Sequence, residues 1–482
     1  MEVEFRNKVL IIGYGSVSRC TLPLLLKHIT IPLENITIID IEDKSAELSD
    51  WTARGIRFFQ KRVTPENLDS VLSGYLSAGS LLIDLSWNID CCAILKWCHD
   101  NKVLYLNTSV EIWDPESEEF TVHPYERTLY YRQMQLNDLT KNWEGTTTCI
   151  VDHGANPGLI SHFARQGLID IAHRMIADGI APDPARLADL IRTRDFAHLA
   201  MEIGVRVVHC SERDTQVSKI PKKKDEFVGT WSIMGLREEG IAPAEMGWGT
   251  HETHLPEGTV VPPDGPKNEI ILNRMSIDTE VRSWIPDEEI VGMVIRHGEG
   301  FGISDRWTVW EDGRAVYRPT VHYAYMPCEA TRESLQELRE RNFVLQEKLR
   351  IMTDSEIVSG ADKLGALLMG HPYKSWWTGS ILTIEEARRL APGQNATTVQ
   401  VALGVIAAVI WMIKNPDKGF RLPDDLPHDF ILGIAKPYLG TFHSGPSDWT
   451  PCRCAEGGCA GDHCSPDDPE GVWVFKNFLT VQ

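Results

Sequence analysis

The chain has 482 residues, of which 43% are hydrophobic, 48 are Lys or Arg and 68 are Asp or Glu, so its formal net charge is −20 at neutral pH. This length suits two or three domains with cores of ordinary size, and the acidic balance argues against nucleic acid and anionic membranes as partners. Small cationic molecules remain compatible with such a charge.

The chain opens with a pattern that is typical of a nucleotide-binding turn. Residues 9–12 read VLII, as a buried strand does, and residues 13–18 read GYGSVS before a helical pattern. A strand, a Gly-x-Gly turn and a helix N-terminus together offer backbone N–H groups and the positive end of a helix dipole to a pyrophosphate. An ordinary tight turn without a ligand is the alternative that the glycines alone leave open. We predict cofactor contacts from Gly13, Tyr14, Gly15, Ser16 and Val17.

A second strand supplies the acid that a dinucleotide site needs. Residues 36–40 read ITIID, and Asp40 stands 25 positions after Gly15. Its carboxylate can accept hydrogen bonds from the ribose hydroxyls and repels a 2′-phosphate, so the sequence predicts NAD rather than NADP. The departure from the fingerprint is Ser18, which stands where a third glycine is expected.

The first 150 residues alternate strand-like and helical patterns. Strands are expected at 9–12, 36–40, 81–85 and 103–106, and helices at about 17–29, 66–77 and 90–100. This rhythm is typical of a doubly wound parallel sheet, so we predict an α/β fold with a Rossmann-type NAD-binding domain over residues 1–150. Nicotinamide sits at the carboxyl ends of the strands in such a domain. By position, the further candidates for cofactor contact are Leu85, Ser86, Asn107, Thr108, Ala155, Asn156 and Pro157, with Ser109 and Glu111 nearby, although Asn107 to Ser109 fit a capped turn equally well.

Residues 151–390 have a different character. Runs such as EFVGTWSI, EIILNR, EEIVGMVIRH and RWTVWED alternate with turn residues, which predicts an α+β substrate-binding and dimerisation domain with a mostly antiparallel sheet. A charged, solvent-facing helix is expected from about 331 to 351. The C-terminal segment, 391–482, contains an apolar stretch at 395–415 that we expect to be a buried helix packed back on the first domain. An irregular loop at 450–467 and a final strand at 472–481 complete the prediction.

Location and thiol state follow from simple patterns. No secretory signal is visible, and the longest apolar run, residues 401–413, is short for a membrane span, so we expect a cytoplasmic protein. The 11 cysteines suit reduced thiols better than a disulfide framework. Their densest cluster could bind zinc, but its spacing is not that of a standard zinc ribbon, so the sequence favours a loop with incidental thiols and no metal. This cluster consists of Cys452, Cys454, Cys459, His463 and Cys464.

Polar side chains inside the runs of the second domain are candidates for chemistry. They are Glu212 in HCSERDTQ, Trp231 and Glu239 in TWSIMGLREEG, and His297 and Glu299 in VIRHGEG. Taken singly, each carboxylate fits a solvated surface acid, the histidine a hydrogen-bonded structural residue and the tryptophan a core residue. The patterns alone therefore leave their roles open.

Several long blocks of the sequence are similar to bacterial homospermidine synthases. They are GYGSVSR with TLPLL, GANPGLISHF, ERDTQ, TWSIMGLREEGIAPAEMGWGTHE, VYRPTVHYAYMPC and TIEEARRLAPGQNAT, and together they span nearly the whole chain. Such blocks are far more specific than a glycine fingerprint, so the chain resembles this family in particular. The resemblance implies a saccharopine-dehydrogenase-like two-domain architecture, a homodimer and a tightly held NAD that is reduced and reoxidised within one turnover.

The resemblance also implies a reaction and roles for individual residues. Two putrescine molecules, or putrescine and spermidine, would give homospermidine with release of ammonia or diaminopropane, through amine oxidation, imine exchange and reduction. Trp231 would face a substrate ammonium or iminium, and Glu212 and Glu239 would bind amine ends. Asn156 and His297 would lie beside the reacting nitrogen, with His297 as the group that transfers the proton.

Two other functions remain open at the level of the sequence. A net NAD(P)H-dependent dehydrogenase of the saccharopine or carboxynorspermidine type would need an arginine or lysine for its substrate's carboxylate, whereas the residues selected are acids, Asn, His and Trp. A non-catalytic NAD-binding sensor would bind NAD without turning over putrescine. Under the main interpretation, Glu111 would line the same cavity as the other acids.

Overall fold

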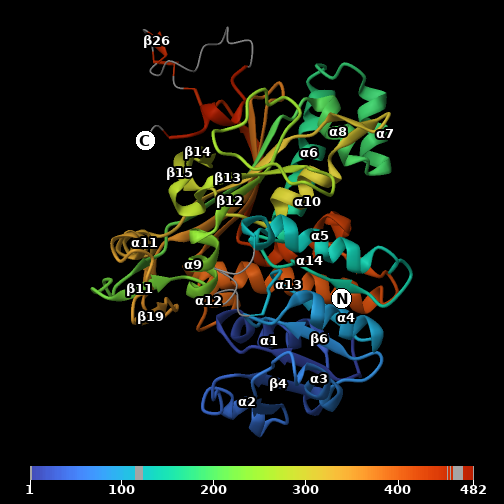
Figure 1. Cartoon of the computed structure of the whole chain (residues 1–482), viewed down its shortest axis with the longest axis vertical. Coiled ribbons are helices and arrows are strands. Elements are labelled where there is room, and N and C mark those ends of the chain that lie inside the picture. Colours follow the sequence, from blue (N-terminus) through green and yellow to red (C-terminus); the bar gives the residue numbers. More distant parts are fainter. Residues whose placement is uncertain (1–2, 114–122, 453, 456–457, 460–470, 481–482) are drawn as a thin grey trace.

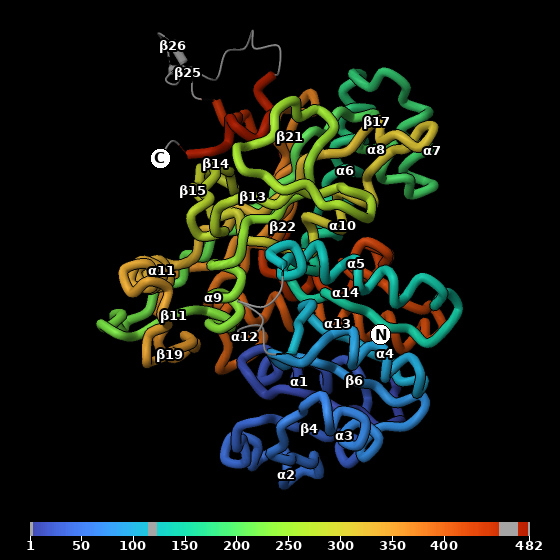
Figure 2. Tube along the Cα trace, in the orientation of Figure 1, coloured from blue at the N-terminus to red at the C-terminus, as the bar shows by residue number. Residues whose placement is uncertain are grey.

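The computed structural model describes residues 3–113, 123–452, 454–455, 458–459 and 471–480. The chain forms two lobes (Figure 1). The lower lobe in this view holds a parallel sheet with the N-terminal helices around it, and the upper lobe is built on a larger, mostly antiparallel sheet. Helices α13 (Ala396–Lys414) and α14 (His428–Ala435) bring the C-terminal part of the chain back between the lobes (Figure 2).

The lower lobe contains a seven-stranded parallel sheet in the order β23-β8-β7-β6-β2-β4-β5. Counting outward from β2 in both directions gives the doubly wound order of a dinucleotide-binding fold, which confirms the predicted Rossmann-type sheet. All residues of β2 are buried, as expected for a strand covered on both faces. The strands are β2 (Val9–Ile12), β4 (Ile36–Asp40), β5 (Arg57–Gln60), β6 (Leu81–Asp84), β7 (Leu104–Asn107), β8 (Cys149–Ile150) and β23 (Phe420–Arg421).

The expected helices of this lobe are present with small shifts at their ends. They are α1 (Ser16–His28), α3 (Leu68–Tyr75) and α4 (Cys91–Asp100). The short helix α2 (Ser49–Ala53), strand β5 and helix α5 (Leu129–Thr140) are not predicted by the sequence patterns. β5 lies at the exposed edge of the sheet, and α5 buries polar as well as apolar side chains, so neither has a clear apolar periodicity.

The upper lobe contains a nine-stranded sheet. Its main path runs β13-β12-β18-β9-β21-β22-β24, and β14 and β15 form a hairpin beside β18. β18 and β9 run parallel, whereas the other described pairs of this sheet are antiparallel, which confirms the predicted mostly antiparallel sheet. Helix α6 (Leu159–Ala177) packs against β21 and β22. The strands are β9 (Val207–Asp214), β12 (Pro243–Gly247), β13 (Glu269–Met275), β14 (Glu280–Ile285), β15 (Glu288–Met293), β18 (Thr320–Met326), β21 (Ala361–Met369), β22 (Ser375–Thr383) and β24 (Thr441–Ser447).

The remaining elements connect or flank the two sheets. The helices are α7 (Pro184–Thr193), α8 (Phe196–Ile203), α9 (Ile233–Ile241), α10 (Gly298–Arg306), α11 (Glu329–Glu340) and α12 (Ile384–Leu390). The strands pair as two-stranded ribbons: β1 (Val3–Glu4) with β3 (Ile29–Thr30), β10 (Val217–Ser218) with β20 (Ile357–Ser359), β11 (Glu226–Gly229) with β19 (Lys348–Ile351), β16 (Val309–Glu311) with β17 (Arg314–Tyr317), and β25 (Cys454–Ala455) with β26 (Gly458–Cys459).

The charged helix expected over 331–351 is shorter than predicted. α11 ends at Glu340, and the chain turns through Asn342 and Phe343, both with positive φ, before it enters β19. The left-handed backbone at these two residues prevents the helix from continuing. Leu335 and Leu338 are buried, so one face of α11 packs on the protein instead of facing solvent.

The final strand expected at 472–481 is also wrong. The segment contains a 3₁₀ turn at Phe475–Asn477, and the rings of Phe475 and Phe478 are buried. Side chains three residues apart point to opposite faces of a strand but to the same side of a 3₁₀ turn. The turn therefore places both rings against the buried His322, with ring centroids 5.4 Å and 6.3 Å away.

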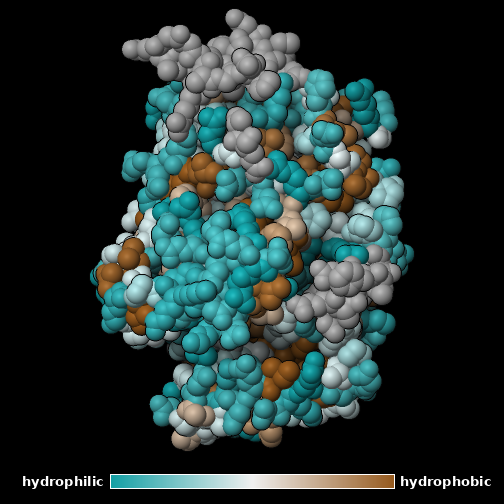
Figure 3. Space-filling model, turned by 60° about the vertical axis from the view of Figure 1, so that its left-hand side comes forward, coloured by the Kyte–Doolittle hydropathy of each residue, from teal (hydrophilic) through white to brown (hydrophobic). Residues whose placement is uncertain are grey.

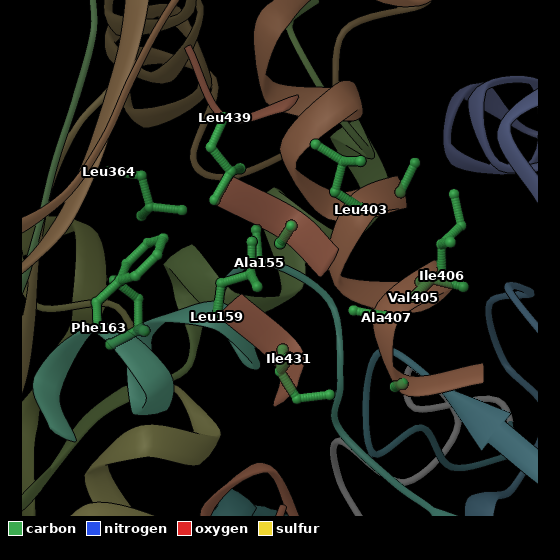
Figure 4. Close-up of a cluster of buried hydrophobic side chains, with 14 of the residues drawn as sticks. Ala155, Leu159, Phe163, Leu364, Leu403, Val405, Ile406, Ala407, Ile431 and Leu439 are labelled. Carbon is green, nitrogen blue, oxygen red and sulfur yellow. The ribbon is translucent and has the colours of Figure 1, made fainter. Parts of the chain in front are cut away.

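Helix α13 lies at the centre of the molecule. It contacts α1 of the lower lobe and β21 and β22 of the upper lobe. By length and composition it could cross a membrane, but 89% of its apolar stretch is buried inside the protein. In Figure 4, Leu403 and Ile406 of this helix belong to one apolar cluster with Leu159 of α6 and Ile431 of α14. A helix that is apolar all round suits this place because other elements cover it on every side.

The tail departs from the expectation of reduced thiols. Cys452 is disulfide-bonded, whereas the seven cysteines described as free all lie before residue 330. In the same cluster, Cys454 and Cys459 are opposite residues in the backbone pairing of the β25–β26 ribbon, and His463 and Cys464 lie outside the described residues. The absence of a metal from this cluster stays a prediction.

Candidate active site

A cavity of about 1020 Å³ lies between the two lobes. Its lower wall is formed at the carboxyl ends of β2, β4, β6 and β7, and its upper wall by residues of β9, α9, β18 and the segment before α10. Ligands of doubly wound folds bind at this end of the sheet. The residues selected from the sequence that line the cavity are Gly13, Gly15, Ser16, Val17, Asp40, Leu85, Ser86, Thr108, Ser109, Glu111, Ala155, Asn156, Pro157, Glu212, Trp231, Glu239 and His297.

The glycine turn forms one end of the cavity. Gly13 has a φ of +84°, and a Cβ atom there would lie 2.6 Å from the carbonyl oxygen of Leu85, so a side chain does not fit. Gly15 is the N-cap of α1, and a Cβ atom there would meet nothing within 4 Å. Gly15 therefore leaves open space before the positive end of the helix, where a pyrophosphate can sit. The hydroxyl of Ser18 donates to the Gly13 carbonyl oxygen, so the residue in place of the third glycine braces the turn.

Asp40 lies at the carboxyl end of β4 with its carboxylate held in place. The N–H of Tyr14 donates to Oδ2 at 2.6 Å, and the N–H of Glu42 donates to Oδ1 at 2.8 Å. Each carboxylate oxygen can accept more than one hydrogen bond, so the group can still bind ribose hydroxyls. The ring of Tyr14 is buried in the core and does not line the cavity, so this residue contributes through its main chain.

Asn107 lies behind the cavity wall instead of on it. Its side chain is buried, Oδ1 accepts from the Asp152 N–H at 2.9 Å, and Nδ2 donates to the Tyr105 hydroxyl at 3.0 Å. Asn107 thus ties the end of β7 to the segment after β8. Closer to the cavity, the Ser109 hydroxyl donates to Glu111 Oε1 at 2.9 Å.

Three side chains of the upper wall meet at one carboxyl oxygen. Asn156 Nδ2 donates to Glu212 Oε2 at 2.6 Å, and the Tyr323 hydroxyl donates to the same oxygen. Asn156 comes from the loop before α6, Glu212 from β9 and Tyr323 from β18. Burial, together with the nearby Asp362 and Asp214, raises the pKa of Glu212 well above its usual value. This carboxyl can therefore hold a proton at neutral pH.

Trp231 lines the cavity at the corner between β11 and α9. The helix begins after Ser232, whose hydroxyl accepts a hydrogen bond from the Gly235 N–H, so Trp231 lies outside the strand that the sequence pattern suggested. Its indole Nε1 donates to the Tyr325 hydroxyl at 3.1 Å. The Tyr325 ring stacks on that of Tyr323 with centroids 5.6 Å apart, so the indole is held by the aromatic pair beside Glu212.

His297 lies between two carboxyl groups. Its Nε2 is 3.8 Å from Glu239 Oε2, and its Nδ1 is 3.5 Å from Glu299 Oε2. Burial alone would lower the pKa of His297, but the close Glu299 carboxylate and the negative charges of Glu239 and Asp152 outweigh it, and the pKa is raised. The imidazole ring also lies 4.6 Å from that of Tyr323, between centroids. A group able to carry a proton is thus fixed beside Glu239 and Glu299.

Three further acids of the wall titrate near neutral pH. Burial raises the pKa of Glu239 to about 7, with an added contribution from the charge of Glu238. Burial and Glu238 likewise raise the pKa of Glu111 to about 7, and burial with Glu299 raises that of Asp152 to about 8. Such acids can attract a cationic amine when ionised and can take up its proton.

The sequence patterns do not single out five other side chains of the cavity. Asp152 follows a strand at its carboxyl end, as other candidates do, so its position alone could have identified it. Arg296 and Glu238 are direct neighbours of the selected residues His297 and Glu239. Arg132 lies on a helix without a clear apolar face, and Tyr323 lies in an apolar strand.

The donor groups of the cavity suit an organic cation. Among the residues that the structure describes, no group of three or more His, Cys, Asp or Glu side chains is arranged to hold a metal ion. Carboxylates and an indole are instead the groups that bind an ammonium in proteins.

Comparison with known protein families covers most of the chain. Residues 9–150 match the saccharopine dehydrogenase NADP binding domain, and residues 154–445 match the saccharopine dehydrogenase C-terminal domain. The structure is also similar to apo saccharopine dehydrogenase (L-Glu forming) from Saccharomyces cerevisiae, with a TM-score of 0.50 at 14% identity over 90% of this chain and 98% of that chain. This likeness shows a shared fold.

Closer relatives extend over the full length. The chain is 37% identical to homospermidine synthase from Blastochloris viridis over 98% of this chain and 97% of that protein, and 35% identical to homospermidine synthase from Mesorhizobium japonicum over 99% and 97%. The crystal structure of homospermidine synthase from Legionella pneumophila in complex with NAD is similar with a TM-score of 0.86, at 35% identity over 100% of this chain and 99% of that chain. The chain therefore belongs to the homospermidine synthase family.

Proposed function

We propose that this chain is an NAD-dependent homospermidine synthase. It joins two putrescine molecules into homospermidine with release of ammonia, or putrescine and spermidine with release of diaminopropane. The observation that carries the proposal is a single cavity that combines a glycine turn for a dinucleotide with an acidic, tryptophan-containing wall for amines. The full-length similarity to proteins named homospermidine synthase supports the same conclusion.

The residues of the lower wall fit NAD. When bound, NAD takes a hydride from the amine-bearing carbon and returns it to the new imine, so the overall reaction involves no net oxidation. Gly15 leaves room for the pyrophosphate, and Asp40 is held where a carboxylate accepts ribose hydroxyls and disfavours a 2′-phosphate. Asp40 therefore favours NAD, although the matched family domain is described as NADP binding. Leu85, Ser86, Thr108 and residues 154–157 lie along the cavity wall beyond the turn.

The upper wall binds the amine ends of the substrate. A desolvated cation over a tryptophan gains on the order of 2 kcal/mol, and ionised carboxylates add charge-assisted hydrogen bonds. We assign the first role to Trp231 and the second to Glu239. Glu212, which can hold a proton at neutral pH, is assigned to an amine end through hydrogen bonds of its carboxyl group. Glu111 adds negative charge on the same cavity.

The reacting amine has to lose its proton before its carbon can give up a hydride. An alkylammonium has a pKa of ~10.4, so a neighbouring base is required at neutral pH. His297 lies 3.8 Å from Glu239, the pKa of Glu239 is raised to about 7, and the pKa of His297 is raised by the neighbouring carboxylates. This arrangement supports His297 as the group that moves this proton. Asn156, hydrogen-bonded to Glu212, is the side chain assigned to the reacting nitrogen.

The alternative of a net dehydrogenase acting on an amino acid receives less support. Such a substrate needs a free Arg or Lys for its carboxylate. Arg132 and Arg296 do line the cavity, but both are already paired with Glu238 at 2.8 Å and 2.9 Å. The other Lys and Arg residues of the wall, Lys61 and Arg62, follow β5 beside Asp40, at the dinucleotide end of the cavity. The alternative of a non-catalytic NAD sensor does not explain why Glu212, Trp231 and His297 lie on one cavity wall.

Assembly and location are proposed with less direct support. The hydrophilic surface in Figure 3 carries several apolar patches. Exposed apolar side chains lie on or next to the ribbons β10–β20 and β11–β19, and this surface is our candidate for a homodimer contact. These side chains are Val217, Ile220, Val344, Leu349 and Val358. Light scattering of the purified protein can measure whether the protein has the mass of a dimer. We keep the cytoplasm as the expected location.

The central experiment is incubation of the purified protein with putrescine and a catalytic amount of NAD. Mass spectrometry should detect homospermidine and ammonia, with total NADH unchanged at the end. A requirement for stoichiometric NADH and an added aldehyde would point to the dehydrogenase instead. NAD binding without any product would point to the sensor.

A pair of tryptophan variants sharpens this experiment. Trp231→Ala should lower kcat/KM for putrescine by about 30-fold, the equivalent of about 2 kcal/mol. Trp310 is 49% exposed on β16 and does not line the cavity, so Trp310→Ala serves as the matched control and should keep full activity. Equal activity of the two variants would contradict the role of Trp231.

A further inference from the structure

Two arginines lie on the wall of a cavity that we propose to bind cations. Arg132 comes from α5, and Arg296 comes from the segment between β15 and α10. Their side chains are 8% and 5% exposed. A cationic substrate gains nothing from these groups, because like charges repel. Solvent and salt screen this repulsion only weakly when the charges are partly buried. Their presence therefore needs a reason other than contact with a diamine.

Both guanidinium groups donate to one oxygen atom. Arg132 Nη2 lies 2.8 Å from Glu238 Oε1, and Arg296 Nη2 lies 2.9 Å from the same atom. Their other terminal nitrogens donate to main-chain carbonyls, Arg132 to that of Val110 and Arg296 to that of Arg127, each at 2.9 Å. Arg296 Nη1 also lies 3.5 Å from Glu245 Oε1. The shorter contact of both arginines is nevertheless to Glu238, toward which the main chain orients them.

Glu238 is the most accessible member of this triad. Its side chain is 18% exposed and lines the cavity in front of the two arginines. Burial alone would raise the pKa of Glu238, but Arg296 and Arg132 more than compensate and lower it. Glu238 is therefore ionised at neutral pH, whereas the next residue, Glu239, has a pKa of about 7 and faces His297.

Two arginines that converge on one point form a site for a carboxylate. In this cavity the protein itself supplies the carboxylate. We propose that Glu238 is a specificity-determining residue: it occupies the anion site formed by Arg132 and Arg296 and so excludes amines that carry a carboxylate, while diamines are admitted. The inference rests on the proposed function, since it concerns the same amine-binding cavity.

The charge balance of the cavity gives the physical reason. With Glu238 in place, an incoming carboxylate would find both arginines occupied and would face the acids Glu111 and Glu239. A buried carboxylate without a cationic partner is strongly disfavoured. Without Glu238, Arg132 would lose its carboxylate partner and Arg296 would keep only the longer contact to Glu245, at 3.5 Å, so the two arginines would recruit an anion from solution.

The first test uses acetate as the smallest carboxylate probe and needs no turnover. Thermal unfolding of Glu238→Ala is measured with increasing sodium acetate, at an ionic strength kept constant with sodium chloride. Acetate should raise the Tm of this variant in a dose-dependent way and leave the wild type unchanged. Glu311 is exposed on β16, so Glu311→Ala is the matched control and should also show no response.

The second test compares putrescine with ornithine, which is the same diamine with one added carboxylate. Ornithine is added as an inhibitor of homospermidine formation from putrescine. Its inhibition constant should fall by about ten- to hundredfold from the wild type to Glu238→Ala, which empties the anion site, as expected for one new charge-assisted carboxylate contact. Adding Arg132→Gln to Glu238→Ala should remove most of this gain.

Each outcome decides for or against the proposal. If Glu238→Ala does not fold alone, it is refolded with acetate and with chloride, and a folded yield that acetate does not increase overturns the proposal. Equal inhibition of the wild type and Glu238→Ala by ornithine also overturns it. If the wild type forms no homospermidine, the proposed function fails, but the response of Glu238→Ala to acetate still tests the anion site.

Discussion

At the scale of single residues, the protonation of the cavity acids is governed by their surroundings. Burial raises the pKa values of Glu239 and Asp152 to about 7 and about 8. Glu238 is also partly buried, but Arg296 and Arg132, which both donate to it, lower its pKa. The two adjacent glutamates thus differ in pKa because two arginines hold Glu238, whereas burial outweighs the charges of His297 and Arg296 at Glu239.

The raised pKa of Glu239 predicts a pH dependence of activity. Below about pH 7 this carboxyl takes up a proton and no longer attracts an ammonium, and above it the carboxylate is present. We expect kcat/KM for putrescine to rise with pH through this range. One pH unit below the pKa of Glu239, kcat/KM should be about tenfold lower than its maximum at higher pH, where the carboxylate is fully ionised. Initial rates measured from acidic to mildly alkaline pH test this.

Two isosteric variants separate the contributing groups. Glu239→Gln should have a lower kcat/KM and a shallower acidic limb, but some slope should remain because the pKa of Glu111 is also about 7. Glu111→Gln should show the converse, with the Glu239 limb retained. A Glu239→Gln profile as steep as that of the wild type would show that another group controls the limb.

Sequence reasoning identified part of this site and missed part of it. Trp231 lies in one of the blocks that resemble the family, and His297 is a polar residue within an apolar run of the second domain; both line the cavity. Arg132 lies on a helix with no clear apolar face and gives no signal. Tyr323 reads as one more aromatic residue of a buried strand, and only the packing of β18 beside β9 brings its hydroxyl to Glu212.

At the scale of elements, the loop that carries Asn156 depends on helix α13. This loop, residues 154–158, runs between β8 and α6, and its main chain lies against the helix at Gly404. A Cβ atom on Gly404 would lie 1.9 Å from the carbonyl oxygen of Gly154. The close approach of helix and loop therefore requires glycine at this position.

We expect Gly404→Ala to be destabilising by about 1–3 kcal/mol, because the backbone of the loop has to move. The same shift should displace Asn156 from Glu212 and lower kcat for homospermidine formation. Chemical denaturation and steady-state kinetics measure the two effects.

A glycine on a neighbouring helix provides the control. A Cβ atom on Gly433 of α14 would meet nothing within 4 Å. Alanine is the better helix former, so Gly433→Ala should stabilise the protein by about 0.5–1 kcal/mol and leave kcat unchanged. If both variants behave alike, the close contact at Gly404 does not support the loop.

At the scale of the whole molecule, both lobes are needed to form the cavity, because each contributes only part of its wall. The dinucleotide end belongs to the parallel sheet, and Glu212, Trp231 and His297 come from the upper lobe. A ligand that extends along the cavity contacts both lobes and couples their stability. The return of the chain through α13, which packs on α1 and on β21, holds the lobes together.

Removal and addition of NAD should therefore change the stability of the entire protein. At a free concentration of about 100 times its Kd, NAD should stabilise the fold by about 2.7 kcal/mol, seen as a Tm increase of a few degrees over protein stripped of the cofactor. NADP should give a smaller shift because its 2′-phosphate meets Asp40. Equal shifts for the two cofactors would contradict the role assigned to Asp40.

The sequence by itself determined the parallel sheet, the glycine turn with Asp40, and the family. These follow from local patterns and long matching blocks, in which each residue's role depends on near neighbours in the chain. Only the tertiary structure decided which residues share the cavity, that Tyr14 and Asn107 do not line it, and that Glu238 pairs with Arg132 and Arg296. These facts depend on contacts between residues far apart in the chain, from 45 positions for Asn107 and Asp152 to 106 for Arg132 and Glu238, and on the burial and charge that such contacts create.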